Sequence, residues 1–210
     1  MKNFFIVLLL FSFFAMEPLL FAAGSDLGMS GQPPEKRQRK TKCPPFEKRL
    51  RKELLTLSAV QDTHLLGAFP CKTNILLWRA YIHGPEDSLY TGLRFDLGFE
   101  FTDSYPLEAP KVFFITPCYH PNVDLQSGEI CVDFLKEAWS PLMNIESILR
   151  SLTSLLNEPN PASALNGDAA RYFLENGQLK SEKLISYVAK IFKLHKQGSN
   201  PELDKKFAGS

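Results

Sequence analysis

Cysteine is scarce in this chain of 210 residues, and no two cysteines stand in a CxxC pair. This spacing argues against a structural zinc site, and no other metal site is indicated. Two disulfides are arithmetically possible, but a domain of this size can rely on its apolar core. The chain also has no excess of charge of one sign, since 24 basic residues nearly balance 23 acidic ones. The net charge is +1, so nothing in the overall composition indicates nucleic-acid binding. The four cysteines are Cys43, Cys71, Cys118 and Cys131.

Long apolar runs are absent except at the N-terminus, where residues 4–23 are apolar apart from Ser12, Glu17 and Pro18. Residues 1–24 therefore read as a signal peptide or as a membrane anchor. The basic residues between Lys36 and Lys42 favour an anchor with the folded part in the cytosol, at the endoplasmic reticulum or a peroxisome. The lumen of the secretory pathway or a secondary organelle stays open, and so does a misassigned start codon.

Three further segments follow from composition. Residues 25–45 form a basic linker rich in proline and glycine, which is a solvated tether or a contact to acidic lipids. Residues 46–197 carry the periodic patterns of a folded domain. Residues 198–210 are polar, and we expect a flexible tail.

The folded domain shows an order of helix, strands and helices. Helical spacing of apolar residues indicates a first amphipathic helix, and proline precedes it. Apolar residues alternate from Leu93 to Phe101, as in a strand with one buried face. This run and two others rich in β-branched and aromatic residues indicate three strands of an antiparallel meander. Helical spacing returns after Pro141 in three segments. The pattern is typical of an α+β domain with helices packed on one antiparallel sheet. The expected helices are residues 46–60, 144–158, 167–176 and 182–197, and the expected strands are 75–84, 94–101 and 111–116.

An irregular stretch of about 25 residues separates the sheet from the later helices. Long irregular loops inside a compact domain are usually functional. This one contains the triplet His120-Pro121-Asn122 and then Cys131 between apolar residues. A cysteine in such surroundings is by default a buried, inert thiol, and a nucleophile is the alternative.

Seven segments, in this order, resemble the ubiquitin-conjugating enzyme family: "KRLRKEL", "HGPEDSLYTGLRF", "YPLEAPKVFF", the His-Pro-Asn triplet, "GEICVDFL", "AWSP" and "NEPNPASALNGDAA". The resemblance covers about residues 46–196. It implies an N-terminal helix, a four-stranded antiparallel meander and C-terminal helices. We therefore expect a fourth strand or extended segment, poorly patterned, near the cysteine.

The resemblance also implies a reaction. Cys131 matches the cysteine that accepts ubiquitin from an activating enzyme as a thioester, before a lysine or a thiol of a substrate attacks it. Asn122 matches an oxyanion donor that can instead stiffen the loop, and His120 is expected to hold the turn rather than act as a base. Asp133 and Ser163 match acidic and gating positions near the attacking lysine. The family needs no cofactor, since the activating enzyme uses the ATP.

Partner surfaces are implied in the same way. Basic residues of the first helix, Lys48, Arg49 and Lys52, match the face that docks on the activating enzyme. Leu107 and the segment Ser140, Pro141 and Leu142 match two loops that contact RING-type ligases. The expected partners are ubiquitin, the activating enzyme, a ligase and a protein substrate, with membrane attachment through residues 4–23.

Two departures from the family pattern stand out. Nine positions separate Asn122 from Cys131, where most members have eight, and the longer "VDLQSGE" loop is similar to peroxisomal members. Arg150 occupies a usually apolar position on the helix that supports donor ubiquitin. Transfer of another ubiquitin-like modifier, or a non-catalytic binding role, stays open. The presence of Cys131, Asn122 and Asp133 favours the enzyme.

Overall fold

The computed structural model describes residues 43–59, 66–130, 135–173 and 178–208. The predicted signal peptide or anchor and the linker up to residue 42 therefore lie outside the described residues. Within the described ranges, every helix is too short or too polar to span a bilayer.

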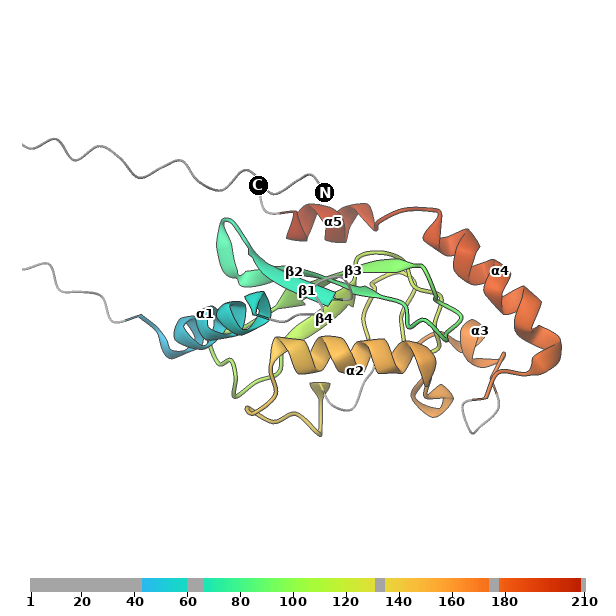
Figure 1. Cartoon of the computed structure of the whole chain (residues 1–210), viewed down its shortest axis with the longest axis horizontal. Coiled ribbons are helices and arrows are strands. Elements are labelled where there is room, and N and C mark those ends of the chain that lie inside the picture. The colour runs from blue at the N-terminus through green and yellow to red at the C-terminus, as the bar shows by residue number, and fades with distance from the viewer. Residues whose placement is uncertain (1–42, 60–65, 131–134, 174–177, 209–210) are drawn as a thin grey trace, which may run out of the picture. The chain divides into compact units, whose positions relative to one another are not determined.

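The described residues form an α+β fold built on one four-stranded antiparallel meander in the order β1-β2-β3-β4 (Figure 1). Helix α1 precedes the sheet and the other helices follow it, as predicted. The strands are β1 Leu66–Cys71, β2 Asn74–His83, β3 Arg94–Glu100 and β4 Lys111–Phe114. The helices are α1 Pro45–Ser58, α2 Ile145–Asn157, α3 Gly167–Ala170, α4 Leu184–His195 and α5 Pro201–Phe207, with short 3-10 turns at Pro161–Ser163 and Ser181–Lys183.

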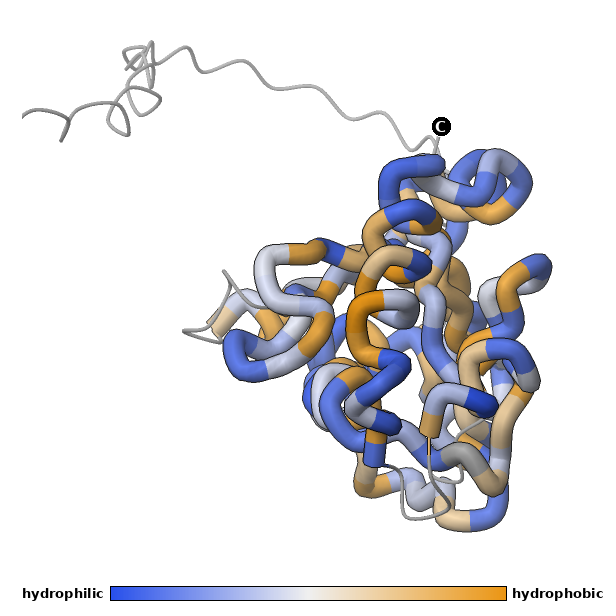
Figure 2. The backbone as a smooth tube through the Cα atoms, turned by 90° about the vertical axis from the view of Figure 1, so that its right-hand side faces the viewer, coloured by the Kyte–Doolittle hydropathy of each residue, from blue (hydrophilic) through white to orange (hydrophobic). Residues whose placement is uncertain are grey.

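The two faces of the sheet carry different layers. Helix α2 packs on the inner face, where the main core lies, and α5 lies across the outer face (Figure 1). The alternation predicted from Leu93 to Phe101 is confirmed, because all five alternating apolar side chains are buried. Figure 2 shows hydrophobic and hydrophilic residues interspersed along the backbone of this domain.

Helix α2 begins at a reciprocal cap. The Asn144 side chain accepts a hydrogen bond from the Ser147 amide, and the Ser147 hydroxyl accepts one from the Asn144 amide. This pairing satisfies two amides that a helix start leaves without partners. The cap fixes where the helix begins, so that Ile145, Ile148, Leu149, Leu152 and Leu156 all face the core.

The fourth strand of the sheet lies elsewhere in the described residues, whereas a short extended segment, the other expected possibility, precedes Cys131. The fourth strand is β1, which pairs with β2 from Leu66 to Cys71. Just before Cys131 there are two single bridges, Phe113 to Glu129 and Val123 to Ile130. Strand β1 has a weak pattern because it is an edge strand with an irregular register at Pro70 and contains Gly67.

Two helices also differ from expectation. Helix α3 ends at Ala170, since the chain then turns at Arg171 and Tyr172 instead of continuing. The tail from residue 198, which we expected to be flexible, contains α5. Phe207 at its end is 1% exposed and packs against Phe113 and Ile115 on the sheet. Burial of this one aromatic ring fixes a short polar helix that would be marginal in isolation.

Candidate active site

Asn122 lies fully buried in the turn that follows β4. Its Nδ2 donates to the carbonyl oxygens of Asn160 at 2.7 Å and Ser163 at 3.1 Å. Its Oδ1 accepts from the Asn160 amide at 2.9 Å. Both amide hydrogens are thus engaged, and the side chain ties the turn to the segment after α2. Nδ2 could donate to a further acceptor only if one of these bonds opened.

His120 holds the same turn from the other side. Its Nδ1 accepts from the Asn122 amide at 3.1 Å, so its Nε2 carries the hydrogen and donates to the Leu155 carbonyl at 3.0 Å. The ring is fully buried, and this burial lowers the pKa of His120 to about 4. A neutral imidazole with both nitrogens engaged supports the predicted structural role.

The loop from Asp124 to Glu129 is closed by its own hydrogen bonds. The Asp124 carboxylate accepts from the Gln126 amide and from both the amide and hydroxyl of Ser127. The Ser127 bonds lower the pKa of Asp124. Gly128 adopts φ +70°, and its amide and carbonyl bond to Asp124 and Phe114. The longer "VDLQSGE" segment is therefore a folded turn held against β4.

Cys131 and Asp133 lie outside the described residues. The chain reaches Cys131 directly from Ile130, which is buried and pairs with Val123. After the gap it resumes at Leu135, which packs against the core. The described neighbours on both sides of this segment, Ile130 and Leu135, are therefore anchored to the domain.

Cys118 lies two residues before His120 and is 1% exposed. Burial raises the pKa of its thiol well above the ordinary value. Since a reactive cysteine needs an accessible thiolate, the Cys118 thiol is placed to pack in the core rather than to react.

Ser163 ends a 3-10 turn that begins after Asn160. Its carbonyl contacts Asn122, and its half-buried hydroxyl accepts from the Asn160 side chain at 3.4 Å. The structure thus brings together three predicted site residues, His120, Asn122 and Ser163.

The basic residues of α1 differ in what they contact. Lys48 and Lys52 are exposed. Arg49 instead donates to the carbonyls of Pro141 at 3.0 Å and Met143 at 2.6 Å, and pairs with Glu53. Arg49 therefore fastens α1 to the loop before α2.

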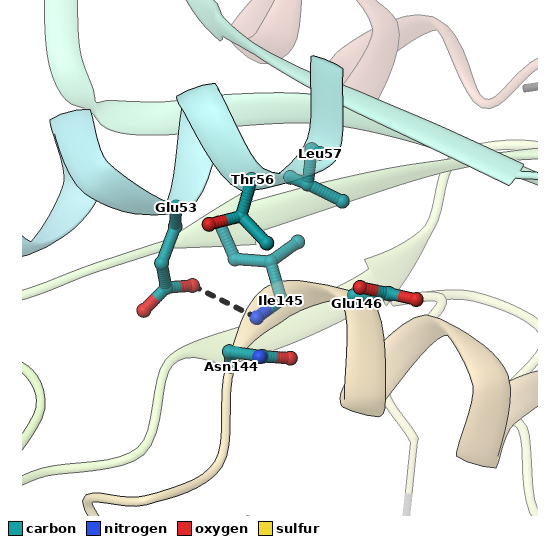
Figure 3. A pocket seen from close by; sticks show the side chains of 6 residues that line it. All are labelled: Glu53, Thr56, Leu57, Asn144, Ile145 and Glu146. Atoms are coloured by element: carbon teal, nitrogen blue, oxygen red, sulfur yellow. Dashed lines mark hydrogen bonds between the residues drawn. The ribbon is translucent and has the colours of Figure 1, made fainter. Parts of the chain in front are cut away.

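Glu53 is the centre of that connection, although it was not predicted as a site residue. Its carboxylate is buried and accepts from the Ile145 amide at 2.8 Å and the Tyr105 hydroxyl at 2.6 Å. Figure 3 shows this carboxylate directed at the N-terminus of α2. A negative charge at a helix N-terminus is favourable.

Two neighbouring loops expose leucines. Leu107 is 77% exposed and Leu142 is 91% exposed. The Trp139 indole donates to the Pro106 carbonyl at 2.9 Å and so joins the loops. Within the second loop, the Leu142 amide bonds to the Ser140 hydroxyl at 3.3 Å, and Pro141 is exposed. These hydrogen bonds hold the two loops in place, and the side chains of both leucines remain accessible to solvent.

Comparison with known proteins identifies the family. The sequence model of ubiquitin-conjugating enzymes matches residues 49–188. This chain belongs to the ubiquitin-conjugating enzyme family. It is 42% identical over 151 residues to ubiquitin-conjugating enzyme E2-20 kDa of Schizosaccharomyces pombe, covering 71% of this chain and 81% of that protein. It is 38% identical to ubiquitin-conjugating enzyme E2 3 of Arabidopsis thaliana over 148 residues, covering 70% of this chain and 97% of that protein.

Solved structures of ubiquitin-conjugating enzymes match the fold. The E2 domain of a Toxoplasma gondii enzyme aligns with a TM-score of 0.62 at 29% identity, covering 73% of this chain and 98% of that one. Pex4p of H. polymorpha, solved with the soluble domain of Pex22p, aligns with a TM-score of 0.65 at 26% identity, covering 74% and 98%. The Pex4p match is consistent with the loop's resemblance to the peroxisomal branch.

Membership in this family makes ubiquitin and the activating enzyme the partners of this conjugating enzyme. Sequence reasoning missed Asn160, which gives Asn122 two of its three partners. A signal for it exists, because asparagine before proline in "EPNPAS" is typical of a turn that the asparagine side chain caps.

Proposed function

We propose that this ubiquitin-conjugating enzyme accepts ubiquitin on Cys131 and passes it to a lysine of a protein substrate. Family membership supplies the reaction class. The observation that carries the assignment to Cys131 is its place in the chain, directly after a turn that internal hydrogen bonds and the β4 backbone hold in position. A loop that presents a nucleophile needs such a fixed approach.

The chemistry proceeds in two acyl transfers. The Cys131 thiolate attacks the C-terminal glycyl carbonyl of ubiquitin held on the activating enzyme, forms a new thioester and releases that enzyme's thiolate. A lysine amine then attacks the new thioester, forms an isopeptide bond, loses a proton and releases the Cys131 thiolate. Free lysine has a pKa of about 10.4, so the site must help to remove this proton. We assign that help to Asp133 and Ser163.

Asn122 and His120 hold the loop in this proposal. The bonds of Asn122 to Asn160 and Ser163 support the stiffening role that was one of its two predicted functions. A direct bond to the oxyanion would exchange one of these partners during the reaction. His120 stays neutral and fixes the turn.

The partner surfaces form a second part of the proposal. Exposed Lys48 and Lys52 are placed to meet an acidic surface of the activating enzyme, while Arg49 supports the neighbouring loop. Exposed Leu107 and Leu142 present the apolar contact for a RING-type ligase, and Trp139 and Ser140 hold their loops in shape.

A loading assay tests the catalytic assignment. The full chain is incubated with activating enzyme, ATP and ubiquitin, and the products are compared with and without reducing thiol. A thiol-sensitive adduct is expected with the wild type and with Cys118→Ala, but not with Cys131→Ala. Failure to load any modifier, or an adduct that survives Cys131→Ala, would overturn the proposal. Loading by another ubiquitin-like modifier alone would replace ubiquitin as the substrate.

A further inference from the structure

Helix α5 lies beyond the part of the chain that the family model matches, which ends at residue 188. Its start is well defined. The Asn200 side chain accepts from the amides of Glu202 and Leu203, and Pro201 occupies the first turn. A seven-residue helix gains little from its own hydrogen bonds, so contacts with the domain must hold it in place.

Phe207 provides the main anchor. Its ring packs on the outer face of the sheet, beside Phe113 and over Gly98 of β3. A Cβ atom at Gly98 would lie 2.2 Å from the Phe207 ring, so the glycine leaves the space that the ring fills. Asp204 adds an ion pair to Arg79 at 2.8 Å, and Lys206 pairs with Glu100. The outer face of the sheet is therefore complementary to this helix in shape and in charge.

The start of α5 contacts the turn that leads to Cys131. The Asn200 amide donates to the Ile115 carbonyl at 2.8 Å, while its Nδ2 donates to the Gln126 carbonyl at 3.1 Å. A methyl group of Leu203 lies 3.1 Å from the place where a side chain at Gly128 would begin. One short helix thus joins the outer face of the sheet to the loop from Asp124 to Glu129.

We propose that α5 is a brace that positions the loop from Asp124 to Glu129, and with it the approach to Cys131, for transfer of ubiquitin to lysine. Asn200 is the positioning residue and Phe207 is its anchor. The inference rests on the proposed role of Cys131. It gives α5, which lies outside the family match, a role in the reaction.

Three substitutions, one at Asn200 and two at Phe207, separate positioning from simple folding. Asn200→Asp keeps an oxygen to cap α5 but removes the donor to the Gln126 carbonyl. Phe207→Ala removes the anchor, and Phe207→Leu retains an apolar group there. Lys205→Ala, at an exposed position on α5, is the matched control. All four are made in the full chain, first charged with ubiquitin and then discharged to free lysine in a single turnover.

Asn200→Asp and Phe207→Ala should discharge about three- to tenfold more slowly than wild type, as expected for loss of one positioning hydrogen bond. Amide hydrogen exchange from Gln126 to Glu129 should rise in both. The midpoint of thermal unfolding of Asn200→Asp should fall by only a few degrees, because one hydrogen bond contributes about 1 kcal/mol, and Phe207→Leu should recover most of the rate. A purely structural role would instead leave discharge by Asn200→Asp unchanged.

Wild-type discharge rates in Asn200→Asp and Phe207→Ala would overturn the brace, and so would slower discharge with unchanged loop exchange. Failure of the wild type itself to load ubiquitin on Cys131 would count against the proposed function instead. The exchange measurement does not depend on loading, so it tests the contact between α5 and the loop in either case.

Discussion

Replacing Asn122 with alanine should both destabilise the domain and slow transfer. The substitution removes three hydrogen bonds and leaves the Asn160 amide and the carbonyls of Asn160 and Ser163 without this partner. A typical net hydrogen bond contributes about 1 kcal/mol, and a buried group left unpaired costs about 1–3 kcal/mol. We expect the free energy of unfolding to fall by about 2–4 kcal/mol.

The assay is urea unfolding of the full chain at neutral pH, read by tryptophan fluorescence. Asn157→Ala, at an exposed position near the end of α2, is the control and should stay within about 0.5 kcal/mol of wild type. A loss of less than about 0.5 kcal/mol for Asn122→Ala would refute the loop-holding role.

Catalysis gives the second half of this prediction. If Asn122 also donates to the oxyanion, discharge to lysine should fall by about 10²–10³ under conditions in which the variant is fully folded. If it only stiffens the loop, the variant should regain much of its rate when free lysine is raised. The measurement is single-turnover discharge over a range of lysine concentrations, after confirming equal loading.

Three further predictions concern the rest of the domain. Burial lowers the pKa of His120 from 6.5 to about 4, so between these pH values the unfolded chain binds a proton that the folded chain does not. The contribution of neutral His120 to the free energy of unfolding is therefore complete above about pH 6.5 and falls by up to about 3 kcal/mol as the pH drops to 4. In unfolding experiments across this pH range, His120→Asn should show a flatter pH dependence than wild type. Leu142→Glu should reduce ligase-stimulated discharge at least tenfold, because it replaces an exposed apolar contact with a charge. Ligase-free discharge should stay unchanged, because the Leu142 side chain is 91% exposed, and equal losses in both assays would contradict a ligase contact. Gly98→Ala should displace the Phe207 ring, because the added Cβ would lie 2.2 Å from it. The free energy of unfolding should fall by up to about 3 kcal/mol through lost ring burial, and unchanged amide exchange in α5 would show that the ring keeps its place.

Much of the fold could be predicted because its main elements have strong local patterns. The alternation from Leu93 to Phe101 indicated a strand with one buried face, and the spacing in residues 144–158 indicated the buried side of α2. Strand β1 lacks such a pattern, since its pairing with β2 depends on neighbours in space. Helix α5 is short and polar, but Asn200 and Pro201 give a recognisable start and Leu203 and Phe207 share one face.

Part of the candidate site could likewise be predicted from the sequence, and part of it could not. The triplet from His120 to Asn122 could be found from the sequence, because the family resemblance depends on it. The partners of Asn122 lie 38 and 41 residues further along the chain, so its hydrogen bonds required the fold. Arg49 was expected to face the activating enzyme, whereas its guanidinium donates to two carbonyls before α2. No local pattern distinguishes an exposed basic residue from one that fastens a distant loop.

The most direct measurement is to identify which thiol carries ubiquitin after loading. The adduct formed with activating enzyme and ATP is digested under conditions that preserve thioesters, and the modified cysteine is located by mass spectrometry. The expected result is modification of Cys131 alone, lost on treatment with reducing thiol and absent from Cys131→Ala. Ubiquitin on Cys43, Cys71 or Cys118 in the wild type, with Cys131 unmodified, would contradict the proposed mechanism.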